Sequence, residues 1–371
     1  MDKQAPTRVL VVYPFMHHYR FGVFSALEAD RRLTVTFASA RQGRNGVETI
    51  PRELFRRHVE TRTTNFKRFS YQSKIFRLAL SPRYDSLVFL GDVWSLSTWL
   101  GAAAGRLRRK KVLFWTIGWH RPERGLIKLL RISFYRLADE LLLYGNVGKT
   151  IGVAMGYAPE RMTVIYNSHV SSQQAAVLAD GSVVAQLTDA SRSVGAVVRL
   201  NPTKRLDLLI EAVGLLKKRG LDVGVILAGE GPERDRLSWL AKSKGVRVVF
   251  LGAVYAESDL RAIYSRLRAT VIPAAAGLSV IQSLSHGVPV ITDDDDYGQM
   301  PEAEAIQPGV TGSRFARGDV TALAEAIERW LPERDDAALT RAAEEEITAR
   351  WSATSQARAI AARILAWQEK R

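Results

Sequence analysis

Residues 269–292 read ATVIPAAAGLSVIQSLSHGVPVIT, and this stretch decides the fold. Two short apolar runs, Ala269–Ile272 and Val288–Thr292, have the length and the β-branched content of buried strands. Between them, a loop of small residues leads into a segment with helical apolar spacing, which we expect to open near Gly277. A strand, a helix and a second strand in this order predict a βαβ unit with parallel strands.

The same alternation of short apolar runs and longer helical segments extends along the chain in two series. The first series of expected strands is Val9–Tyr13, Thr34–Ala38, Ser86–Leu90, Val112–Trp115, Glu140–Tyr144 and Thr163–Ile165. The second series is Val194–Val198, Gly224–Ala228, Val248–Leu251, Ala269–Ile272, Val288–Thr292 and Ser313–Phe315. Each series predicts one doubly wound parallel sheet, so the expected fold class is α/β with two Rossmann-like domains.

A length of 371 residues accommodates two domains, and the polar, alanine-rich segment between the two series has the composition of a linker. The predicted boundaries are residues 1–168 for the N-terminal domain, 169–192 for the linker, 193–345 for the C-terminal domain and 346–371 for a final helix. In that last segment the spacing of Trp351, Ile360, Ile364 and Trp367 lets them share one helical face. Two tryptophans so near the chain end predict that the helix packs on a domain.

The composition excludes several classes of protein. The sequence contains no cysteine, which rules out disulfide scaffolds, zinc ribbons, iron–sulfur clusters and thiol nucleophiles. The net charge of +15 is confined to one half, because residues 1–166 hold 28 Lys and Arg against 12 Asp and Glu, while the rest holds 25 against 26. This asymmetry predicts an anionic partner for the first half, either nucleic acid or a lipid headgroup surface.

The surplus cations gather in three clusters of the first half. The clusters are Arg52, Arg56, Arg57, Arg62, Lys67, Arg68, Lys74 and Arg77, then Arg106, Arg108, Arg109, Lys110 and Lys111, then Arg121, Arg124, Lys128 and Arg131. The third recurs at i, i+3, i+7 and i+10, which predicts a cationic helix stripe with Leu126, Leu130 and Leu137 on the opposite face. An ordinary solvated helix face is the alternative.

No apolar run reaches the roughly eighteen residues of a membrane span, and the first residues lack the length and cleavage site of a signal peptide. We therefore expect a cytoplasmic protein that attaches peripherally to the inner face of the cytoplasmic membrane. A nucleic-acid partner is the less favoured alternative, because the sequence has neither aromatic–basic repeats nor a helix-turn-helix pattern.

The run Asp293–Asp296 follows an expected strand and could hold a metal ion. Adjacent carboxylates on an extended chain point alternately to opposite sides, so we favour a solvated loop and predict no metal site.

Two cations follow the first strand of the second series. Residues 197–205 read VVRLNPTKR, which is a strand ending at Arg199 and a short loop that carries Lys204. The carboxyl ends of parallel strands face the ligand crevice of an open α/β sheet. Two fixed cations there suit a diphosphate, and exposed loop charges are the alternative.

Small residues also follow the neighbouring strands, at Gly229–Pro232 and at Gly252–Tyr255. Each glycine would let the backbone approach a ligand closely. The helix that opens near Gly277 would aim the backbone N–H groups of Leu278 and Ser279 at an anion beside Arg199 and Lys204.

Taken in this order, the segments from about Val197 to Trp330 resemble the retaining nucleotide-sugar glycosyltransferases of the GT-B fold, family 4. The likeness includes the Arg199…Lys204 pair, Gly229–Pro232, Phe250–Gly252, Gly287–Ile291 and Glu304 before Gly309–Gly312. It continues through Ala322–Ile327 and Arg350–Ser352, and in the first half it is limited to Ala138–Glu140 and Val164–Asn167.

The resemblance implies two domains facing a central cleft, with the final helix crossing back to the N-terminal domain. It implies that Arg199 and Lys204 are the catalytic cations, which stabilise the departing diphosphate of a nucleoside-diphosphate sugar. The donor-binding residues that it implies are Gly277, Leu278, Ser279, Gln282, Val254, Tyr255 and Glu304. It implies no metal and no cofactor besides this co-substrate.

One departure from the family pattern concerns two glutamates eight positions apart, whose places are taken here by Ala274 and Gln282. The second glutamate of the family contacts the ribose hydroxyls, and a glutamine amide can do the same. The first contacts the transferred sugar, and alanine cannot. The identity of the sugar and the activity itself therefore depend on what else reaches that position.

The N-terminal domain should supply the acceptor side. His17, His18, Tyr19 and Arg20 follow the first expected strand, and Gly118, Trp119 and His120 follow the fourth. These side chains could bind an anionic or hydroxylated acceptor, or could instead cap and support the next helix.

The sequence thus predicts a glycosyltransferase that moves a sugar from a nucleoside-diphosphate sugar to a lipid-linked or glycan acceptor at an anionic membrane surface, with no nucleic-acid partner. A nucleotide-sugar epimerase or hydrolase of the same fold is one alternative. A non-catalytic sugar-nucleotide-binding relative is another, favoured by Ala274.

Overall fold

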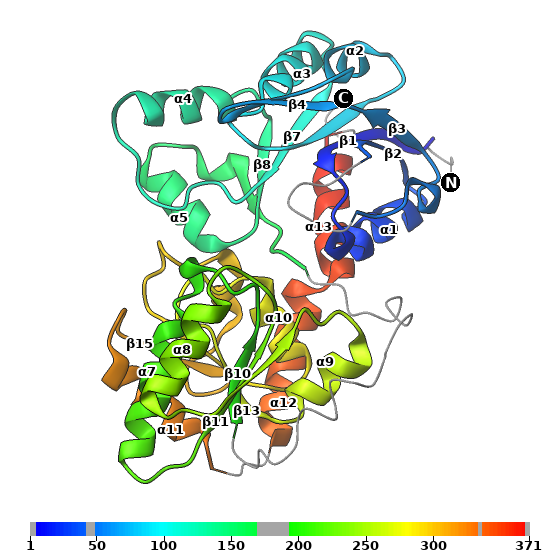
Figure 1. The fold of residues 1–371 in the computed structure, drawn as a ribbon. Coiled ribbons are helices and arrows are strands. Elements are labelled where there is room, and N and C mark those ends of the chain that lie inside the picture. The colour runs from blue at the N-terminus through cyan, green and yellow to red at the C-terminus, as the bar shows by residue number, and fades with distance from the viewer. Residues whose placement is uncertain (1–4, 42–48, 169–192, 333–335, 368–371) are drawn as a thin grey trace. The chain divides into compact units, whose positions relative to one another are not determined.

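The computed structural model describes residues 5–41, 49–168, 193–332 and 336–367. The chain forms two compact units. The N-terminal unit is Met1–Val170 together with Ser352–Arg371, and the C-terminal unit is Ser171–Trp351. Each unit contains one large parallel sheet, so the predicted α/β class with two doubly wound sheets is confirmed (Figure 1). The predicted linker, residues 169–192, lies outside the described residues.

The sheet of the N-terminal unit has seven strands in the order β3-β2-β1-β6-β7-β8-β9, all parallel. The strands of this unit are β1 (Thr7–Phe15), β2 (Leu33–Ala40), β3 (His58–Thr61), β4 (Thr63–Phe66), β5 (Phe69–Gln72), β6 (Ser86–Leu90), β7 (Lys111–Thr116), β8 (Glu140–Leu143) and β9 (Met162–Val164). The helices are α1 (Phe21–Ala29), α2 (Ile75–Leu80), α3 (Leu96–Leu107), α4 (Gly125–Tyr135), α5 (Asn146–Ala154) and α13 (Ala353–Leu365), with 3-10 turns η1 (His18–Arg20), η2 (Arg52–Leu54) and η3 (Pro159–Arg161).

Alternate residues of the central strands bury opposite faces of this sheet. Leu10 and Val12 of β1 join a core with α2, α3, α4 and α5, whereas Val9, Val11 and Tyr13 join a core with α1 and α13. Successive side chains of a strand point to opposite faces, so a sheet covered by helices on both sides needs continuous apolar strands. The unbroken runs in the sequence have this cause.

Three short strands of this unit were not predicted. Strand β3 pairs with the outer edge of β2, and β4 and β5 form a separate antiparallel hairpin that turns at Lys67 and Arg68. These strands are short and partly exposed, so they lack the apolar run that marks a central strand. Four cations of the first cluster lie in the hairpin or beside it, namely Arg62, Lys67, Arg68 and Lys74.

Helix α13 confirms the predicted return of the chain to the N-terminal unit. It packs against α1 and buries Ala357, Ile360, Ala361 and Ile364. At its start, the Ser168 hydroxyl donates a 2.8 Å hydrogen bond to Gln356 Oε1. The end of the first domain is thereby tied to the first turn of the last helix.

The return begins later than predicted, at Ser352 rather than at residue 346. Residues Ile347–Trp351 form a π-helical turn, η6, in the C-terminal unit. Trp351 is buried there, and its indole N–H donates a 3.0 Å hydrogen bond to Glu346 Oε1. Trp351 therefore does not share the face of Ile360 and Ile364, because the chain changes direction between them.

The sheet of the C-terminal unit has six parallel strands in the order β12-β11-β10-β13-β14-β15. They are β10 (Ser193–Val197), β11 (Gly224–Ala228), β12 (Val248–Gly252), β13 (Leu267–Val271), β14 (Val290–Asp293) and β15 (Gly312–Phe315). The helices are α7 (Leu206–Lys218), α8 (Arg234–Lys244), α9 (Glu257–Tyr264), α10 (Leu278–Ser285), α11 (Val320–Trp330) and α12 (Asp336–Glu346), with 3-10 turns η4 (Pro202–Lys204) and η5 (Pro301–Ala305). All twelve predicted strands are present in the two units, with ends that differ by at most two residues.

The strand order reverses between β10 and β13, because the chain moves outward from β10 through β11 and β12 and then returns to the other side of β10. Helix α7 contacts both α8 and α11, and α9 packs on Ile226 and Ala228. An open α/β sheet binds its ligands at such a reversal, beside the carboxyl ends of the two central strands. In the N-terminal unit the corresponding reversal lies between β1 and β6.

Within the described residues, no helix combines the length and the apolar character that crossing a membrane requires.

The packing of α13 on the N-terminal unit generates a stability prediction. Ile360 is fully buried, so Ile360→Ala should lower the free energy of unfolding by about 2–5 kcal/mol through lost burial and a residual cavity. Arg358→Ala changes an exposed position of the same helix and should change it by less than about 0.5 kcal/mol. Urea unfolding followed by circular dichroism measures both, and equal stability of the two variants would contradict the assigned packing.

Candidate donor and acceptor sites

The loop after β10 carries the two predicted cations. Arg199 is exposed, and Lys204 is partly buried at the end of the turn η4. Lys204 Nζ donates a 2.5 Å hydrogen bond to the carbonyl of Ala275, and the Ala274 N–H donates to the carbonyl of Lys204 at 3.2 Å. These two bonds join the loops after β10 and β13, which are the two strands at the reversal.

The glycines after β11 pack directly against the backbone of this loop. A Cβ on Gly229 would lie 1.9 Å from the carbonyl oxygen of Val198, and one on Gly231 would lie 2.1 Å from that of Leu200. The Leu200 N–H also donates to the carbonyl of Glu230 at 3.0 Å. We predicted that these glycines approach a ligand, but the structure shows that they approach the backbone on either side of Arg199. Their small size therefore sets the position of the Arg199 loop.

Helix α10 begins directly beyond the second loop. Its N-cap, Gly277, makes no side-chain capping bond, and the Ser279 hydroxyl donates a 2.8 Å hydrogen bond to the carbonyl of Val197 at the end of β10. The predicted helix start near Gly277 is confirmed. The structure brings the first turn of α10, the end of β10 and the Lys204 loop together in one place.

A buried carboxylate that the sequence did not indicate lies behind these loops. Glu302 of η5 is 2% exposed, and a Cβ on Gly277 would lie 3.9 Å from its Oε2. Burial lowers the pKa of Lys204, and the negative charge of Glu302 opposes this by raising it. Glu302 therefore favours the charged form of the cation that we expect to meet the ligand.

Two glutamines take part in the same region. Gln299 holds the loop through its Oε1, which accepts a 2.7 Å hydrogen bond from the N–H of Ala276, and through its Nε2, which donates to Asp293. Gln282 accepts a 3.1 Å hydrogen bond from the Tyr264 hydroxyl at its Oε1. That bond orients the amide of Gln282 with its Nε2 on the other side. Neither Gln299 nor Tyr264 stands out in the sequence, because their roles depend on the loop that each one meets.

The remaining predicted donor residues lie in two further loops. Val254 and the exposed Tyr255 follow β12 and precede α9, and Glu304 lies in η5 beside Glu302. The aspartate run after β14 is not a set of open carboxylates, since Asp295 pairs with Arg317 and Asp296 pairs with Arg314. Within the described residues, no group of three or more histidine and acidic side chains is placed to hold a metal ion.

The first acceptor candidates follow β1 at the reversal of the N-terminal sheet. His17 and Tyr19 stack with ring centroids 4.8 Å apart, and His18 is exposed beside Tyr19. Burial, the Arg20 charge and His18 lower the pKa of His17 to about 4. The His17 imidazole is therefore neutral at physiological pH, and it can form hydrogen bonds with a hydroxyl without carrying charge.

Arg20 is buried, which corrects its predicted place on the acceptor surface. Its guanidinium donates to Tyr144 at 2.8 Å and to Asn167 at 3.0 Å, and it lies 5.1 Å from the centre of the Trp115 ring. These partners belong to β7 and to the ends of β8 and β9. Arg20 therefore links the loop after β1 to the other half of the sheet.

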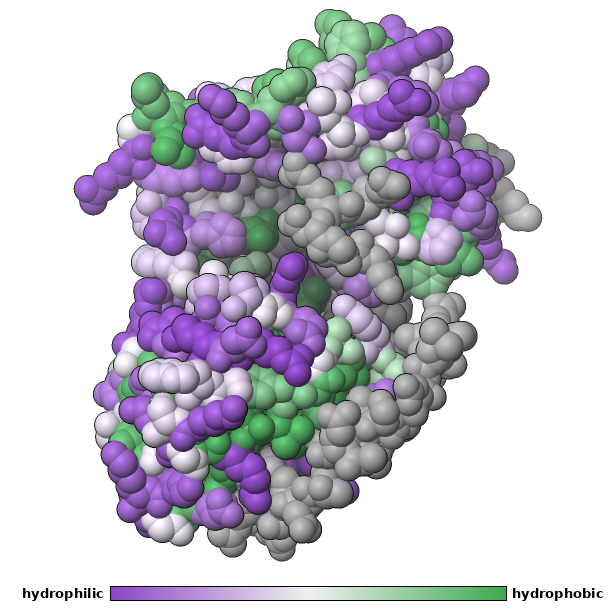
Figure 2. All heavy atoms as spheres, in the orientation of Figure 1, coloured by the Kyte–Doolittle hydropathy of each residue, from purple (hydrophilic) through white to green (hydrophobic). Residues whose placement is uncertain are grey.

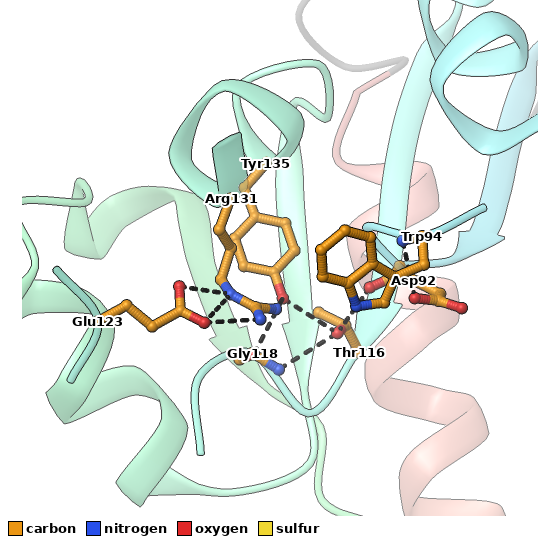
Figure 3. A network of polar contacts seen from close by, with 8 residues as sticks. Asp92, Trp94, Thr116, Gly118, Glu123, Arg131 and Tyr135 are labelled. Carbon is orange, nitrogen blue, oxygen red and sulfur yellow. Dashed lines mark hydrogen bonds and ion pairs between the residues drawn. The ribbon is translucent and has the colours of Figure 1, made fainter. Parts of the chain in front are cut away.

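Figure 3 shows why the turn after β7 is structural. The Tyr135 hydroxyl donates to the carbonyl of Gly118 at 2.9 Å, the Gly118 N–H donates to Thr116 Oγ1 at 3.2 Å, and Arg131 pairs with Glu123 at 2.7 Å. Gly118 is buried, and these hydrogen bonds already engage its N–H and its carbonyl, so it serves the turn rather than an acceptor.

Trp119 is also buried, with its ring 4.8 Å from that of Tyr135. The structure thus places Trp119 in the core and leaves His120 as the exposed member of the predicted trio.

The loop after β6 contributes a residue that the sequence analysis missed. Asp92 is exposed at the reversal of the N-terminal sheet, and its carboxylate accepts a 3.0 Å hydrogen bond from the N–H of Trp94 (Figure 3). A strand end next to the reversal is the feature that could have identified it, once the strand order was known.

The comparisons with known proteins agree with this architecture. Residues 185–347 match the family model of the glycosyl transferases group 1. A GDP-mannose-dependent alpha-(1-6)-phosphatidylinositol monomannoside mannosyltransferase of Mycobacterium tuberculosis is 30% identical over 171 residues, which are 43% of this chain and 43% of the relative. The match therefore spans less than half the length of this relative.

Two solved structures show the same fold over nearly the whole chain. HepE of Anabaena, crystallised in complex with UDP, matches with a TM-score of 0.72 at 17% identity. The match covers 97% of this chain and 100% of the HepE chain. A glycosyltransferase from Rickettsia africae has a TM-score of 0.72 at 16% identity, with 96% and 97% covered. The fold is thus that of the GT-B class. The C-terminal unit matches the glycosyl transferases group 1 family over residues 185–347.

The close contact between the glycine loop and the Arg199 loop generates the second prediction. Gly231→Ala places a Cβ against the Leu200 carbonyl and should destabilise the C-terminal unit by roughly 1–3 kcal/mol. Gly214→Ala, in the middle of α7, meets nothing closer than 3.5 Å and should be neutral or stabilising by up to about 1 kcal/mol. Thermal unfolding of the two variants tests this contrast, which would be lost if the loops were further apart.

Proposed function

We propose that this protein transfers a sugar from a nucleoside-diphosphate sugar to an acceptor. The observation that carries the proposal is the meeting of Lys204, the Arg199 loop and the first turn of α10 at the reversal of the C-terminal sheet. A helix N-terminus without a side-chain cap and two cations on the loop after β10 would suit the negative charge of a diphosphate. The family match of residues 185–347 supports the same reaction.

In this reaction negative charge develops on the departing phosphate oxygen. Arg199 and Lys204 would stabilise that charge together with the backbone N–H groups of Leu278 and Ser279. The Gln282 amide would contact the ribose hydroxyls through its Nε2, since its Oε1 is engaged by Tyr264. By family resemblance the new bond forms on the same face of the sugar as the old one.

The remaining donor contacts surround this centre. Tyr255 and Val254 would cover the nucleotide from the loop after β12, and Glu304 would approach it from η5. Ala274 cannot replace a carboxylate at the sugar, so the sugar is selected by other groups.

We further propose a lipid-linked or glycan acceptor held by the N-terminal unit at an anionic membrane surface, on the inner face of the cytoplasmic membrane. The Mycobacterium tuberculosis relative is a phosphatidylinositol monomannoside mannosyltransferase, which supports an acceptor that is a lipid. The N-terminal half carries the whole charge surplus, which supports an anionic surface. His17, His18, Tyr19 and His120 are the acceptor-side candidates that the structure leaves at least partly exposed, and Asp92 joins them.

Two alternatives share the donor site. A nucleotide-sugar epimerase or hydrolase would convert the donor without an acceptor, and a non-catalytic relative would bind the donor without converting it. Ala274 favours the second alternative, because it removes a sugar contact. Analysis of the products with and without a panel of acceptors separates the three functions.

The first experiment is a thermal-shift screen of nucleoside diphosphates and their sugars. A ligand that binds only the folded protein adds about 2.7 kcal/mol of stability at one hundred times its dissociation constant. One class of nucleotide should raise the melting temperature of the protein. The absence of a shift with every nucleotide would refute the donor site.

The two cations generate the third prediction. Arg199→Ala and Lys204→Ala should each lower kcat/KM for the donor about 10²- to 10³-fold, because each removes a group that stabilises leaving-group charge. Lys218→Ala removes an exposed cation of α7 and should change kcat/KM less than about twofold. Melting curves of the three variants show whether each one folds. Full activity of a folded Lys204→Ala variant would contradict the assigned role.

The lowered pKa of Lys204 generates the fourth prediction. Only the protonated amine attracts a diphosphate, so affinity for the nucleotide sugar should fall as the pH rises through the lowered pKa of Lys204. Glu302→Gln removes the charge that raises this pKa, so the fall should begin at a lower pH.

The control is Lys204→Arg, whose guanidinium stays charged throughout the range and should remove this part of the pH dependence. Isothermal titration of wild type and both variants with one nucleotide sugar measures the affinity at each pH. Protonation of the nucleotide base affects all three proteins equally, so it cancels in the ratio of variant affinity to wild-type affinity. Identical profiles for wild type and Lys204→Arg would exclude Lys204 as the titrating group.

A further inference from the structure

Helix α3 exposes a stripe of apolar side chains to solvent. Leu96, Leu100 and Leu107 follow one another at intervals of four and seven residues and therefore lie on one face. All three are exposed, and Leu107 is 79% exposed. A stripe of this kind is ordinarily turned toward the core.

The opposite face of α3 prevents the helix from turning this stripe inward. Gly101 lies close to α2 and Gly105 lies close to β6, because an added Cβ would be 2.9 Å from Ile75 Cγ2 at the first and 2.5 Å from Leu87 Cδ1 at the second. A residue with a Cβ would clash at the positions of Gly101 and Gly105, so α3 cannot rotate to bring its leucines to these positions. The outward position of Leu100 and Leu107 is therefore set by the packing of α3.

Helix α4 exposes a second group of apolar side chains. We predicted Leu126 and Leu130 on a helix face opposite the cations, and in the structure Leu126 is 83% exposed and Leu130 is exposed as well. The helix begins only at Gly125, and its buried residues are Ile132, Phe134 and Tyr135 in the second half. The first half of α4 therefore leaves its apolar side chains largely exposed.

The exposed side chains of the first half of α4 are Leu126, Ile127, Leu129 and Leu130. The two helices are neighbours, because the rings of Trp99 on α3 and Phe134 on α4 lie 5.0 Å apart. Figure 2 shows hydrophobic side chains at the surface over both helices, with hydrophilic ones between and beside them. We call this surface the α3–α4 face, and it consists of Leu96, Leu100, Leu107, Leu126, Ile127, Leu129 and Leu130.

Cations outnumber carboxylates around the α3–α4 face. Residues 93–138 contain ten Lys and Arg but one carboxylate, Glu123, which pairs with Arg131, and Arg106 pairs with Asp139 just beyond this range. The exposed cations Arg108, Arg121 and Arg124 lie at the end of α3 and before α4. The first turn of α4 has no acidic residue and its N-cap is Arg124, so positive charge adds to the positive end of the helix dipole.

Two cations of the sequence clusters do not belong to this surface. Lys110 and Lys111 are buried, and Lys110 Nζ donates to the carbonyl of Ser81 while Lys111 lies 3.8 Å from Glu140 Oε2. The clusters are thus divided by the fold into cations that support the sheet and cations that face solvent.

We propose that the α3–α4 face inserts its leucine and isoleucine side chains into an anionic lipid bilayer, while the surrounding arginines bind lipid phosphates. The chemistry of the face favours a membrane. In one orientation of the protein, the apolar side chains would reach the acyl region while the surrounding cations contact the lipid headgroups. A second protein fits less well, since the cores of protein interfaces are depleted in charged residues. The proposal deepens the proposed function by naming the surface that attaches to the membrane, and it rests on that function.

The experiment uses the full chain and vesicles of equal parts phosphatidylglycerol and phosphatidylcholine. The test variant is Leu100→Ser/Leu107→Ser/Leu126→Ser/Leu129→Ser. The matched control is Trp239→Ser/Val310→Ser, which removes two exposed apolar side chains of the C-terminal unit. Co-sedimentation should show at least a tenfold weaker partition of the test variant and wild-type partition of the control. Wild-type partition of the test variant would overturn the proposal.

A second variant measures how much the cations around the α3–α4 face contribute to membrane binding. Arg121→Gln/Arg124→Gln/Lys128→Gln should weaken partition roughly fivefold for each cation removed, and vesicles of phosphatidylcholine alone should bind weakly. Lys218→Gln/Lys242→Gln/Lys244→Gln removes three exposed cations of the C-terminal unit and should have no effect. Salt screens the charge but not the insertion, so wild-type partition should fall without vanishing at about 0.5 M NaCl. Complete release by salt would overturn the insertion.

The absence of cysteine allows a direct measurement of insertion. Leu129→Cys carries the sole thiol of its chain and can be labelled with a fluorophore that reports polarity, and Val310→Cys provides the control site. The label at residue 129 should shift to the blue on addition of phosphatidylglycerol vesicles, and the label at residue 310 should not. Equal spectra at the two sites would contradict the proposal.

Two further readouts separate the possible failures. The nucleotide-induced thermal shift of the test variant should equal that of wild type, because the donor site lies in the other unit. If the protein binds vesicles but no nucleotide, the proposed sugar transfer is refuted and the proposed membrane insertion is not. If the protein binds a nucleotide but no vesicles, only the proposed membrane insertion is refuted. Sedimentation velocity without vesicles completes the test, since a dimer that the serine variant abolishes would assign the face to a second copy and overturn the proposal.

Discussion

The hydrogen bonds between the loops after β10 and β13 are the constraint on which the donor site depends. Lys204 reaches the carbonyl of Ala275, and the N–H of Ala274 reaches back to the carbonyl of Lys204. Ala275 has a φ of +49°, a conformation that costs a residue with a Cβ about 1–2 kcal/mol. The paired loops hold that conformation and so place a cation beside the first turn of α10.

Everything else in the C-terminal unit supports these two loops. Gly229 and Gly231 let the chain after β11 pass beneath Arg199, Gln299 holds Ala276 from the β14 side, and buried Glu302 favours the charged state of Lys204. These supports come from the ends of two strands, β11 and β14. A sheet whose strands are parallel brings all of these ends to one edge, which is why residues separated by a hundred positions meet there.

The N-terminal unit uses its many cations in two different ways. Arg20, Lys110 and Lys111 are buried and hold strands and loops together through backbone carbonyls, hydroxyls and one carboxylate. Others, such as Arg108, Arg121 and Arg124, are exposed in the same region as the exposed leucines of α3 and α4. Net charge alone does not distinguish these groups, because both contribute equally to the surplus of the first half.

The sequence by itself determined the two parallel sheets, the return of the last helix and the places of Arg199, Lys204 and Gly277, because buried strands and helix starts leave local patterns. Local patterns do not state which loop a side chain will meet. Only the tertiary structure decided that Trp119 is in the core, that Trp351 belongs to the C-terminal unit, that Glu302 lies behind Lys204 and that Leu126 faces solvent. The physical reason is that burial depends on strand order and on close contacts such as those of Gly101 and Gly105, which join residues far apart along the chain.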